Sequence, residues 1–295
     1  MDTDPDNDDR VPARPFLKWA GGKWTVAPQI ERLLPHDTRE RVYREPFLGG
    51  GAMYFRLQPR RALLSAALPD LVTTYQVVQH HVDALITHLE RLRAAHSTEH
   101  FYAIRAAFNE HRHDGRVERA AWLIYLNKTC YNGLFRQNQS GAFNVPVGRF
   151  TNPGIVDPPA LRLASAALSD AEIKQARFDG LLAEAEAGDV IYFDPPYVPV
   201  NKAASSVAYA DGAFTLADQG RLAGVFRELD ERGCLMALSN SDTPEVRRLY
   251  AGFDVSPIIA PRAISAKAST RGEITELLIR NVVRYPGRPG RGKAR

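Results

Sequence analysis

The pattern of apolar and polar residues alternates along this chain between patterns typical of strands and patterns typical of helices. Strands are expected at residues 41–45, 62–65, 189–193 and 234–238, and helices at 52–57, 70–93, 216–231 and 243–250. The apolar runs at 189–193 and 234–238 are unbroken, which is typical of strands buried on both faces of a parallel sheet. Strands alternating with helices predict an α/β fold with helices on both sides of the sheet.

One segment, from about residue 96 to residue 167, interrupts this alternation. Two helices are expected there, at 99–109 and 116–126, followed by a stretch at 134–148 that is rich in Asn, Gly and Gln. Its centre at Ser140-Gly141 is typical of a turn, so this stretch is expected to fold as a β-hairpin. We interpret the whole segment as an insertion that carries specificity.

Composition supports a folded protein with an acidic partner. The chain has 295 residues, of which 44% are hydrophobic and 24% charged, with a net charge of +4. Five Asp stand among the first nine residues and five Arg or Lys in the last twelve, so both ends are expected to be disordered. Without the acidic arm, the rest of the chain is more basic than the total suggests, which favours a nucleic acid as the partner.

The same composition argues against several other classes of protein. Two cysteines, Cys130 and Cys234, are too few for a disulfide framework or a cysteine zinc site. His111 and His113 lack a carboxylate or Cys at ligand spacing, so no metal site is expected. No apolar run is long enough to span a membrane, and the acidic start is unlike a signal peptide. A cytoplasmic protein is expected.

The tetrapeptide Asp194-Pro195-Pro196-Tyr197 directly follows the predicted strand at 189–193. Open α/β sheets bind ligands outside the carboxyl ends of their strands, so the position suits a site. An aromatic amine is a poor nucleophile, and acceptors aimed at both its protons make it a better one. The Asp194 carboxylate and the Pro195 carbonyl can be these acceptors, while Tyr197 offers a flat face to an extruded base. A proline-terminated strand is the simpler alternative, but these residue types in this order favour a site.

Two glycine-containing segments precede this motif. In Glu45-Pro46-Phe47-Leu48-Gly49-Gly50-Gly51, glycines after the first strand let the backbone approach a ligand closely. Tyr54 stands where a dinucleotide site needs the last glycine of its fingerprint. In Phe16-Leu17-Lys18-Trp19-Ala20-Gly21-Gly22-Lys23, the following Trp24 excludes a phosphate-binding P-loop. Trp19 is either a core anchor or a residue that faces a ligand.

A fourth segment lies in the insertion and is rich in the side chains that read purine edges. It runs from Asn127 to Asn138 and continues from Phe143 to Phe150, with Arg, Asn and aromatic residues interspersed. Composition alone favours the simpler interpretation, a polar, Asn-rich surface loop.

Together and in this order, the four segments resemble the Dam-type DNA adenine methylases, which insert a target-recognition region between the glycine segment and Asp-Pro-Pro-Tyr. The resemblance covers roughly residues 14–280, and Arg262-Ala263-Ile264, Arg271 and Glu276-Leu277-Leu278 resemble the family's closing segment. It implies a Rossmann-like S-adenosylmethionine-dependent methyltransferase sheet with an inserted, mainly helical target-recognition domain that carries the hairpin. The expected order is a disordered acidic arm (1–13), a catalytic domain (14–94 and 168–281), a recognition domain (95–167) within it, and a basic tail (282–295).

The resemblance also implies roles for single residues. S-adenosylmethionine is the implied methyl donor, surrounded by Trp19, Lys23, Glu45, Pro46, Phe47, Gly49, Gly51, Phe178 and Asp194. The implied catalytic residues are Asp194, Pro195, Pro196 and Tyr197. Those implied to contact duplex DNA are Lys18, Tyr131, Asn132, Leu134, Arg136, Asn138, Pro146 and Arg149. GATC is the implied target. A monomer is expected, and a partner restriction endonuclease or a regulatory role both stay open.

Two positions depart from the family's pattern. Ala66 and Leu68 stand where the family has Asp-x-Asn, whose carboxylate grips the ribose of the donor. Losing that charged hydrogen bond costs about 1.5–3 kcal/mol, or roughly ten- to a hundredfold in affinity. One alternative is therefore a weakened or inactive DNA-binding member. Methylation of an amine in RNA or in protein is another, which Asp194 disfavours because similar motifs there begin with Asn. Phe150 replaces a common tyrosine.

Overall fold

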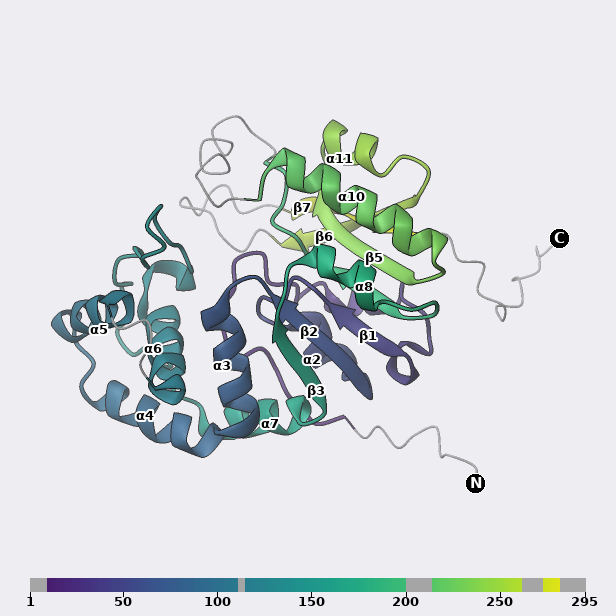
Figure 1. Cartoon of the computed structure of the whole chain (residues 1–295). Helices are drawn as coiled ribbons and strands as arrows, with labels where there is room; N and C mark the ends of the chain where they lie inside the picture. The colour runs from purple at the N-terminus through teal and green to yellow at the C-terminus, as the bar shows by residue number, and fades with distance from the viewer. Residues whose placement is uncertain (1–9, 111–114, 200–213, 262–272, 282–295) are drawn as a thin grey trace, which may run out of the picture.

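The computed structural model describes residues 10–110, 115–199, 214–261 and 273–281, and within them one mixed sheet forms the centre of the molecule (Figure 1). Its strands are β1 (Val42–Glu45), β2 (Arg61–Ala66), β3 (Ala171–Gln175), β4 (Val190–Phe193), β5 (Leu235–Ser241), β6 (Asp254–Pro261) and β7 (Glu273–Arg280). The α-helices are α1 (Ala27–Glu31), α2 (Ala52–Leu57), α3 (Pro69–His80), α4 (Val82–Ala94), α5 (Thr98–Glu110), α6 (Arg116–Thr129), α7 (Pro158–Leu168), α8 (Leu181–Glu184), α10 (Leu216–Glu231) and α11 (Pro244–Leu249). Short 3₁₀ turns are η1 (Thr38–Glu40), η2 (Tyr131–Gly133) and η3 (Phe178–Gly180).

The order of the strands places a binding site. The sheet runs β3-β2-β1-β4-β5-β7-β6, with parallel pairing from β3 to β5 and β7 antiparallel to both of its neighbours. The chain moves outward in one direction from β1 to β3 and in the other from β4 to β5. Ligands of such sheets bind where the direction reverses, outside the carboxyl ends of the central strands. Here that point lies between β1 and β4, and the predicted α/β fold is confirmed.

Helices cover both faces of the sheet, as the unbroken apolar run of β4 predicts. All four residues of β4 are buried. Val190 and Tyr192 belong to the core shared with α1 to α7, whereas Ile191 and Phe193 belong to a second core beneath α10 and α11. Figure 1 shows α10 and α11 over the β5 end of the sheet and α4 to α6 on the far side of α3.

The prediction of a single helix at 70–93 is wrong, because this segment forms two helices. α3 ends at His80 and α4 begins at Val82, with His81 between them at φ −136° and ψ 33°. The apolar face continues through the break, since Leu71, Tyr75, Leu85 and Leu89 are all buried. No glycine or proline marks the bend. It lets α4 pack on α6 and α7, while α3 also reaches β2 and β3.

The inserted segment contains both expected helices, α5 and α6, and an irregular form of the expected hairpin. Two isolated antiparallel bridges, Cys130 with Val147 and Gln137 with Phe143, replace regular strands. The side chain of Asn109 on α5 bonds the backbone N–H and C=O of Phe143, which fixes the hairpin on the helices.

Part of the predicted acidic arm packs on the fold. The backbone N–H and C=O of Val11 both bond the side chain of Gln58, and Ala13 is buried. The first nine residues, the basic tail from 282, His111, His113 and the motif residues Arg262-Ala263-Ile264 and Arg271 lie outside the described residues. In the ranges that the structure describes, no helix has the length and apolar character needed to cross a membrane.

Candidate active site

A large cavity of about 850 Å³ opens at the carboxyl ends of β1, β2 and β4. Its wall is formed by five stretches of chain, at residues 19–23, 45–53, 66–68, 176–178 and 194–197, with Leu71, Phe135, Tyr192, Phe214 and Asp218 completing it. All of the residues that the sequence implied around the methyl donor lie on this wall, as do the four of the Asp-Pro-Pro-Tyr motif. The cavity therefore brings together segments up to about 175 residues apart.

The glycine loop after β1 is packed so closely that side chains do not fit. A Cβ on Gly49 would lie 2.5 Å from the indole of Trp19. Gly51 has φ +68°, and a Cβ there would lie 2.8 Å from the Tyr75 hydroxyl. That hydroxyl donates to the Gly49 carbonyl at 2.9 Å. The glycines thus let the loop lie between Trp19 and Tyr75 while its remaining surface faces the cavity.

The carboxylate of Asp194 meets a buried ammonium where β4 ends. Lys23 Nζ lies 3.0 Å from Asp194 Oδ1, and the Lys23 side chain is only 3% exposed. Nζ also bonds the Gly21 carbonyl and lies 4.6 Å from the centre of the Tyr197 ring. Burial raises the pKa of Asp194 above its ordinary value, and Lys23 opposes that rise.

Three polar side chains hold the turn that follows Asp194. Gln219 on α10 donates from Nε2 to the Pro196 carbonyl at 2.7 Å. Asn240 on β5 donates to Gln219 Oε1 at 3.1 Å and accepts from the Val198 N–H at 3.2 Å. Ser241 donates to the Val198 carbonyl at 2.6 Å. Buried side chains that are hydrogen-bonded to one another therefore hold the Asp-Pro-Pro-Tyr turn in place. The Pro196 carbonyl already accepts a hydrogen bond from Gln219.

A second carboxylate, Glu45 at the end of β1, lies in the same cavity wall. It is buried, and Tyr43 donates a hydrogen bond to its Oε2 at 2.9 Å. Burial raises the pKa of Glu45 to about 8, and the nearby charge of Asp194 adds to the rise. Two acidic groups in one apolar wall suit a cationic ligand, which would stabilise their charged forms.

The opposite end of the cavity is aromatic. The rings of Phe47 and Phe178 stack with centroids 5.5 Å apart, and Phe214 meets both edge-on at 5.6 and 5.7 Å. Ala66 and Leu68 also line the cavity, and neither side chain offers a hydrogen-bond acceptor. This part of the cavity suits a flat ring better than it suits a ribose.

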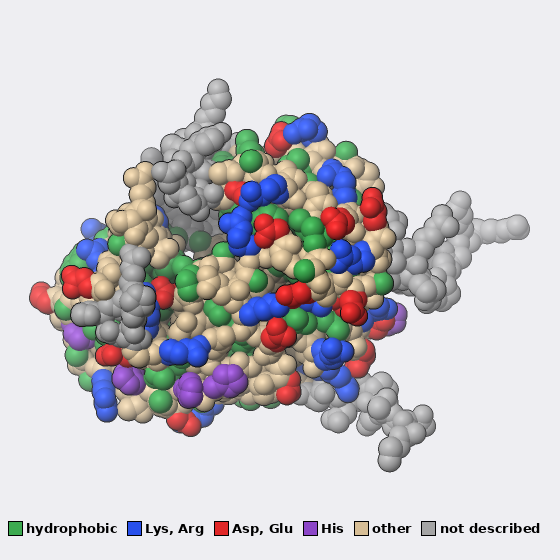
Figure 2. Space-filling model, in the orientation of Figure 1, with side chains coloured by type: hydrophobic (Ala, Val, Ile, Leu, Met, Phe, Trp, Pro, Cys, Tyr) green, Lys and Arg blue, Asp and Glu red, His purple; other side chains and the backbone are tan. Residues whose placement is uncertain are grey.

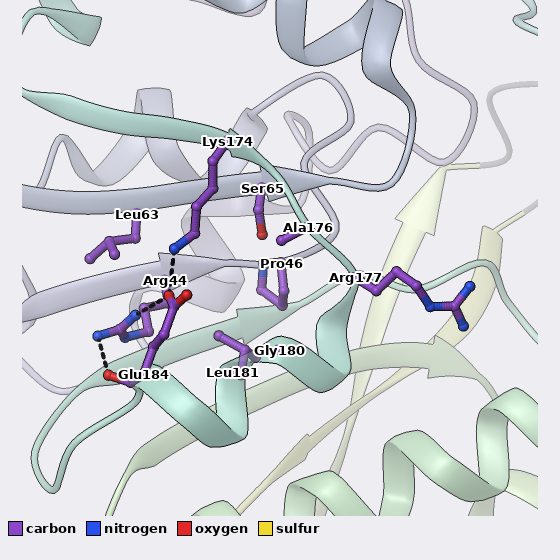
Figure 3. Close-up of a pocket in the computed structure, with 10 residues that line it drawn as sticks. All are labelled: Arg44, Pro46, Leu63, Ser65, Lys174, Ala176, Arg177, Gly180, Leu181 and Glu184. Atoms are coloured by element: carbon purple, nitrogen blue, oxygen red, sulfur yellow. Dashed lines mark hydrogen bonds and ion pairs between the residues drawn. The ribbon is translucent and has the colours of Figure 1, made fainter.

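A small cavity adjoins the large one (Figure 3), and three residues line both: Pro46, Ala176 and Arg177. Lys174 of β3 and Arg44 of β1 converge there on Glu184 of α8, with nitrogen–oxygen distances of 2.6 and 3.7 Å. Arg177 points away from this group. The contacts tie the two strands to α8, and so they support the neighbouring turn that carries Phe178.

On the side of the insertion, one buried asparagine connects the two predicted DNA-contacting segments. Asn127 at the end of α6 accepts from the Lys18 N–H at 2.9 Å and donates to the carbonyls of Lys18 and Gly133 at 2.7 and 3.0 Å. A Cβ on Gly133 would lie 2.6 Å from the Lys18 side chain. Lys18 is therefore fixed beside the Tyr131-Asn132 turn, and its ammonium lies 4.5 Å from the centre of the Phe150 ring.

The other predicted DNA-contacting residues lie on the same insertion but differ in exposure. Those that are exposed are Tyr131, Asn132, Arg136, Asn138, Pro146 and Arg149, whereas Leu134 is half-buried. Arg136 Nε donates to Asn144 at 2.8 Å. Asn138 Oδ1 accepts from the N–H groups of Ser140 and Ala142, so this residue organises the tip of the hairpin. On the face shown in Figure 2, basic and acidic side chains of the described residues are interspersed, so they do not form a continuous basic patch on that face.

Some residues of the site were not expected from the sequence. Gln219, Asn240 and Asn127 are buried amides. Asn127 was noted only as the start of the segment rich in purine-reading side chains, and Asn240 and Gln219 were not singled out. Glu276 on β7 was noted only as part of a closing segment, yet it accepts a hydrogen bond from Tyr197 at 2.8 Å. In the chain as far as it is described, no group of three or more His, Cys, Asp or Glu is placed to hold a metal.

Comparison with known proteins agrees with this geometry. Residues 19–264 match the family described as D12 class N6 adenine-specific DNA methyltransferase. The chain is 41% identical over 285 residues to the Type II methyltransferase M.MjaIII of Methanocaldococcus jannaschii, covering 91% of this chain and 99% of that protein. It is 37% identical over 276 residues to the Type II methyltransferase M1.LlaDCHI of Lactococcus lactis subsp. cremoris, covering 92% and 96%. It is 33% identical over 267 residues to the DNA adenine methylase of Escherichia coli (strain K12), covering 90% and 94%.

Proposed function

Because the chain belongs to the D12 class of N6 adenine-specific DNA methyltransferases, we propose that it takes the methyl group from S-adenosylmethionine and transfers it to adenine in GATC sites of duplex DNA. The family is one of adenine-specific DNA methyltransferases. The alternative of a methylase that acts on amines of RNA or protein is therefore set aside. The alternative of an inactive DNA-binding member is not supported, since the catalytic turn is assembled and the relatives are named as methyltransferases.

The residues of the large cavity fit this donor. A volume of about 850 Å³ has room for a drug-sized ligand together with an extruded base. Glu45 and Asp194 suit the cationic end of the donor, Gly49 and Gly51 leave space along its middle, and Phe47 with Phe178 suits its adenine. When bound, S-adenosylmethionine supplies an electrophilic methyl group.

The chain's own groups activate the adenine amine. The Asp194 carboxylate accepts one of its protons and the Pro195 carbonyl the other, while Gln219 occupies the neighbouring Pro196 carbonyl. These acceptors favour a tetrahedral nitrogen whose lone pair is directed at the methyl group. As nitrogen gains the methyl group it gives up one proton, for which Asp194, with its raised pKa, is the nearest base. Tyr197 stacks on the extruded ring.

The insertion reads the duplex in this proposal. Lys18 and Arg136 contact guanine, and Pro146 packs on a thymine methyl. Tyr131 and Asn132 fill the space that the extruded adenine leaves. Three further contacts are proposed. Leu134 is half-buried and Asn138 organises its own turn, so both are less direct, whereas Arg149 is exposed. Two relatives named as Type II methyltransferases favour the modification half of a restriction–modification system.

The observation that carries the proposal is the position of Asp194, at the end of β4 and on the wall of the donor-sized cavity. The test incubates purified protein and labelled S-adenosylmethionine with a GATC duplex and with a duplex of equal composition that contains GTAC instead. We expect label in adenine of the first duplex alone, and none with Asp194→Ala.

Two results would count against the proposal in different ways. Equal labelling of both duplexes would refute GATC as the target, and mapping the methylated adenines in a random-sequence plasmid would give the true site. Failure to label either duplex, although calorimetry shows the donor to be bound, would refute the activity itself.

A further inference from the structure

β7 contributes one carboxylate to the site that the proposed chemistry does not use. Glu276 lies opposite Ser241 of β5 in the antiparallel register, and its side chain is 17% exposed. Its Oε2 accepts the hydrogen bond from the Tyr197 phenol at 2.8 Å. The same oxygen lies 3.8 Å from Lys23 Nζ. Glu276 therefore touches two groups of the site from outside the catalytic turn.

These contacts close a four-residue cluster of Lys23, Asp194, Tyr197 and Glu276. The Lys23 ammonium stands between the two carboxylates, 3.0 Å from Asp194 Oδ1 and 3.8 Å from Glu276 Oε2. It also lies 4.6 Å from the centre of the Tyr197 ring, at its face. A buried lysine needs oppositely charged partners. Here these partners are Asp194 and Glu276, and Lys23 connects them.

The cluster restricts the ring that is to receive the base. Tyr197 is attached to the turn at one end and to Glu276 at the other, so the ring is fixed at both ends of its long axis. One of its faces is taken by the Lys23 ammonium, which leaves the opposite face for stacking. A catalytic group must be held close to its productive geometry, and a second ring of contacts usually does this.

We propose that Glu276 is a positioning residue, which holds the Tyr197 ring and, through Lys23, the Asp194 carboxylate in the arrangement that receives the target adenine. This inference rests on the proposed function. Loss of Glu276 leaves the donor cavity and the recognition insertion in place. Turnover then falls, while the affinities for donor and DNA change little.

The test compares variants that remove the two ends of the Tyr197–Glu276 contact. Glu276→Ala removes the acceptor, Tyr197→Phe removes the donor, and Glu276→Gln keeps an acceptor without its charge. The matched controls are Glu245→Gln on the surface of α11 and Tyr250→Phe, whose buried hydroxyl has no hydrogen-bond partner among the described residues. The measurements are kcat and KM with a GATC duplex, the melting midpoint, and emission of 2-aminopurine placed at the target adenine.

We expect Glu276→Ala and Tyr197→Phe each to lower kcat about ten- to a hundredfold, the cost of one charged hydrogen bond, with KM nearly unchanged. The loss in the double variant should be clearly smaller than the product of the two single losses, because both changes remove the Tyr197–Glu276 contact. Glu276→Gln should recover part of the loss. Emission of 2-aminopurine should rise in Glu276→Ala, since the base stacks less firmly.

The inference is overturned if Glu276→Ala retains the kcat of the two controls, or if the losses of the single variants multiply in the double variant. A lower melting midpoint with unchanged 2-aminopurine emission would likewise show a purely structural role. Should Glu276→Ala fail to fold, Tyr197→Phe and Glu276→Gln decide the question. Wild-type protein that binds donor and leaves DNA unmethylated would instead refute the proposed function.

Discussion

Ala66, the last residue of β2, separates this site from the family's usual donor pocket. It lines the large cavity at the carboxyl edge of the sheet, at the position where the resemblance implies a carboxylate for the ribose of the proposed donor. Its own side chain is only 5% exposed and offers no acceptor. In the proposed function, the donor is held instead by the aromatic residues, by Glu45 and by the glycine loop.

We expect Ala66→Asp to tighten binding of S-adenosylmethionine by about tenfold or more, since a charged hydrogen bond is worth about 1.5–3 kcal/mol. Calorimetric titration measures the change, with Ala103→Asp on the exposed surface of α5 as the control. Unchanged or weaker binding in Ala66→Asp would mean that the ribose does not lie against β2.

Glu45 makes the stability of the ligand-free protein depend on pH. Burial raises its pKa to about 8, from 4.5 for an ordinary glutamate. Between those values the folded protein keeps a proton on Glu45 that the unfolded chain has lost, so the free energy of unfolding falls as pH rises. Glu45→Gln, which cannot titrate, should lack this part of the slope and gain in relative stability towards pH 8. Urea midpoints of both proteins across this range test it, and parallel curves would contradict it.

At the scale of elements, Asn127 joins the end of α6 to the segment that precedes α1. Its side chain is 1% exposed, and all of its bonds go to the backbone of Lys18 and Gly133. It thereby couples the predicted DNA-reading turn to the chain that leads into Trp19 and Lys23.

We expect Asn127→Ala to weaken discrimination between GATC and GTAC duplexes by about tenfold or more, because it leaves buried backbone groups without partners and frees Lys18. Donor affinity should be unaffected. Methylation rates on the two duplexes and a donor titration measure both effects, and Asn138→Ala at the exposed hairpin tip serves as a comparison. Unchanged discrimination would show that Lys18 does not read the DNA.

Four of the seven strands in the described sheet were predicted because each has its own local signal, whereas β3, β6 and β7 were not among the expected strands. β1, α2, β4 and α10 lie within about a residue of the ranges expected from hydrophobic period and turn residues. The break at His81 has no such signal, since packing of α4 on α6 and α7 decides it. The Asp-Pro-Pro-Tyr turn was predictable in the same way. The Tyr197–Glu276 contact was not, because nothing local relates residues 79 positions apart.

At the scale of the whole molecule, the expected boundary between catalytic and recognition domains is not a boundary in the core. One hydrophobic cluster contains Tyr75 of α3, Leu85 of α4 and Leu123 of α6, together with Val190 of β4. α6 packs on both α3 and α4. Packing is therefore continuous across the expected division, and a division by role stays a prediction.

Continuous packing predicts a single cooperative unfolding transition. Far-ultraviolet circular dichroism and the fluorescence of the three tryptophans should give coincident melting curves, because the parts that they report share one core. A saturating donor analogue should shift both curves together. Two separate transitions, with only one shifted by the analogue, would show that the insertion folds independently.

The position of Trp19 has a consequence for how target specificity can diversify. Its indole lies against Gly49 of the donor loop on one side and stacks on Phe135 of the hairpin at 5.6 Å. This aromatic pair forms a platform under the hairpin segment that also carries the exposed residues Arg136 and Pro146. Because Arg136 and Pro146 are the proposed base-contacting residues, we expect new target sequences to be reached by exchanging them while Trp19 and Phe135 are kept. A library that varies those positions, with Trp19, Gly49 and Phe135 held constant, should yield altered recognition without loss of donor binding.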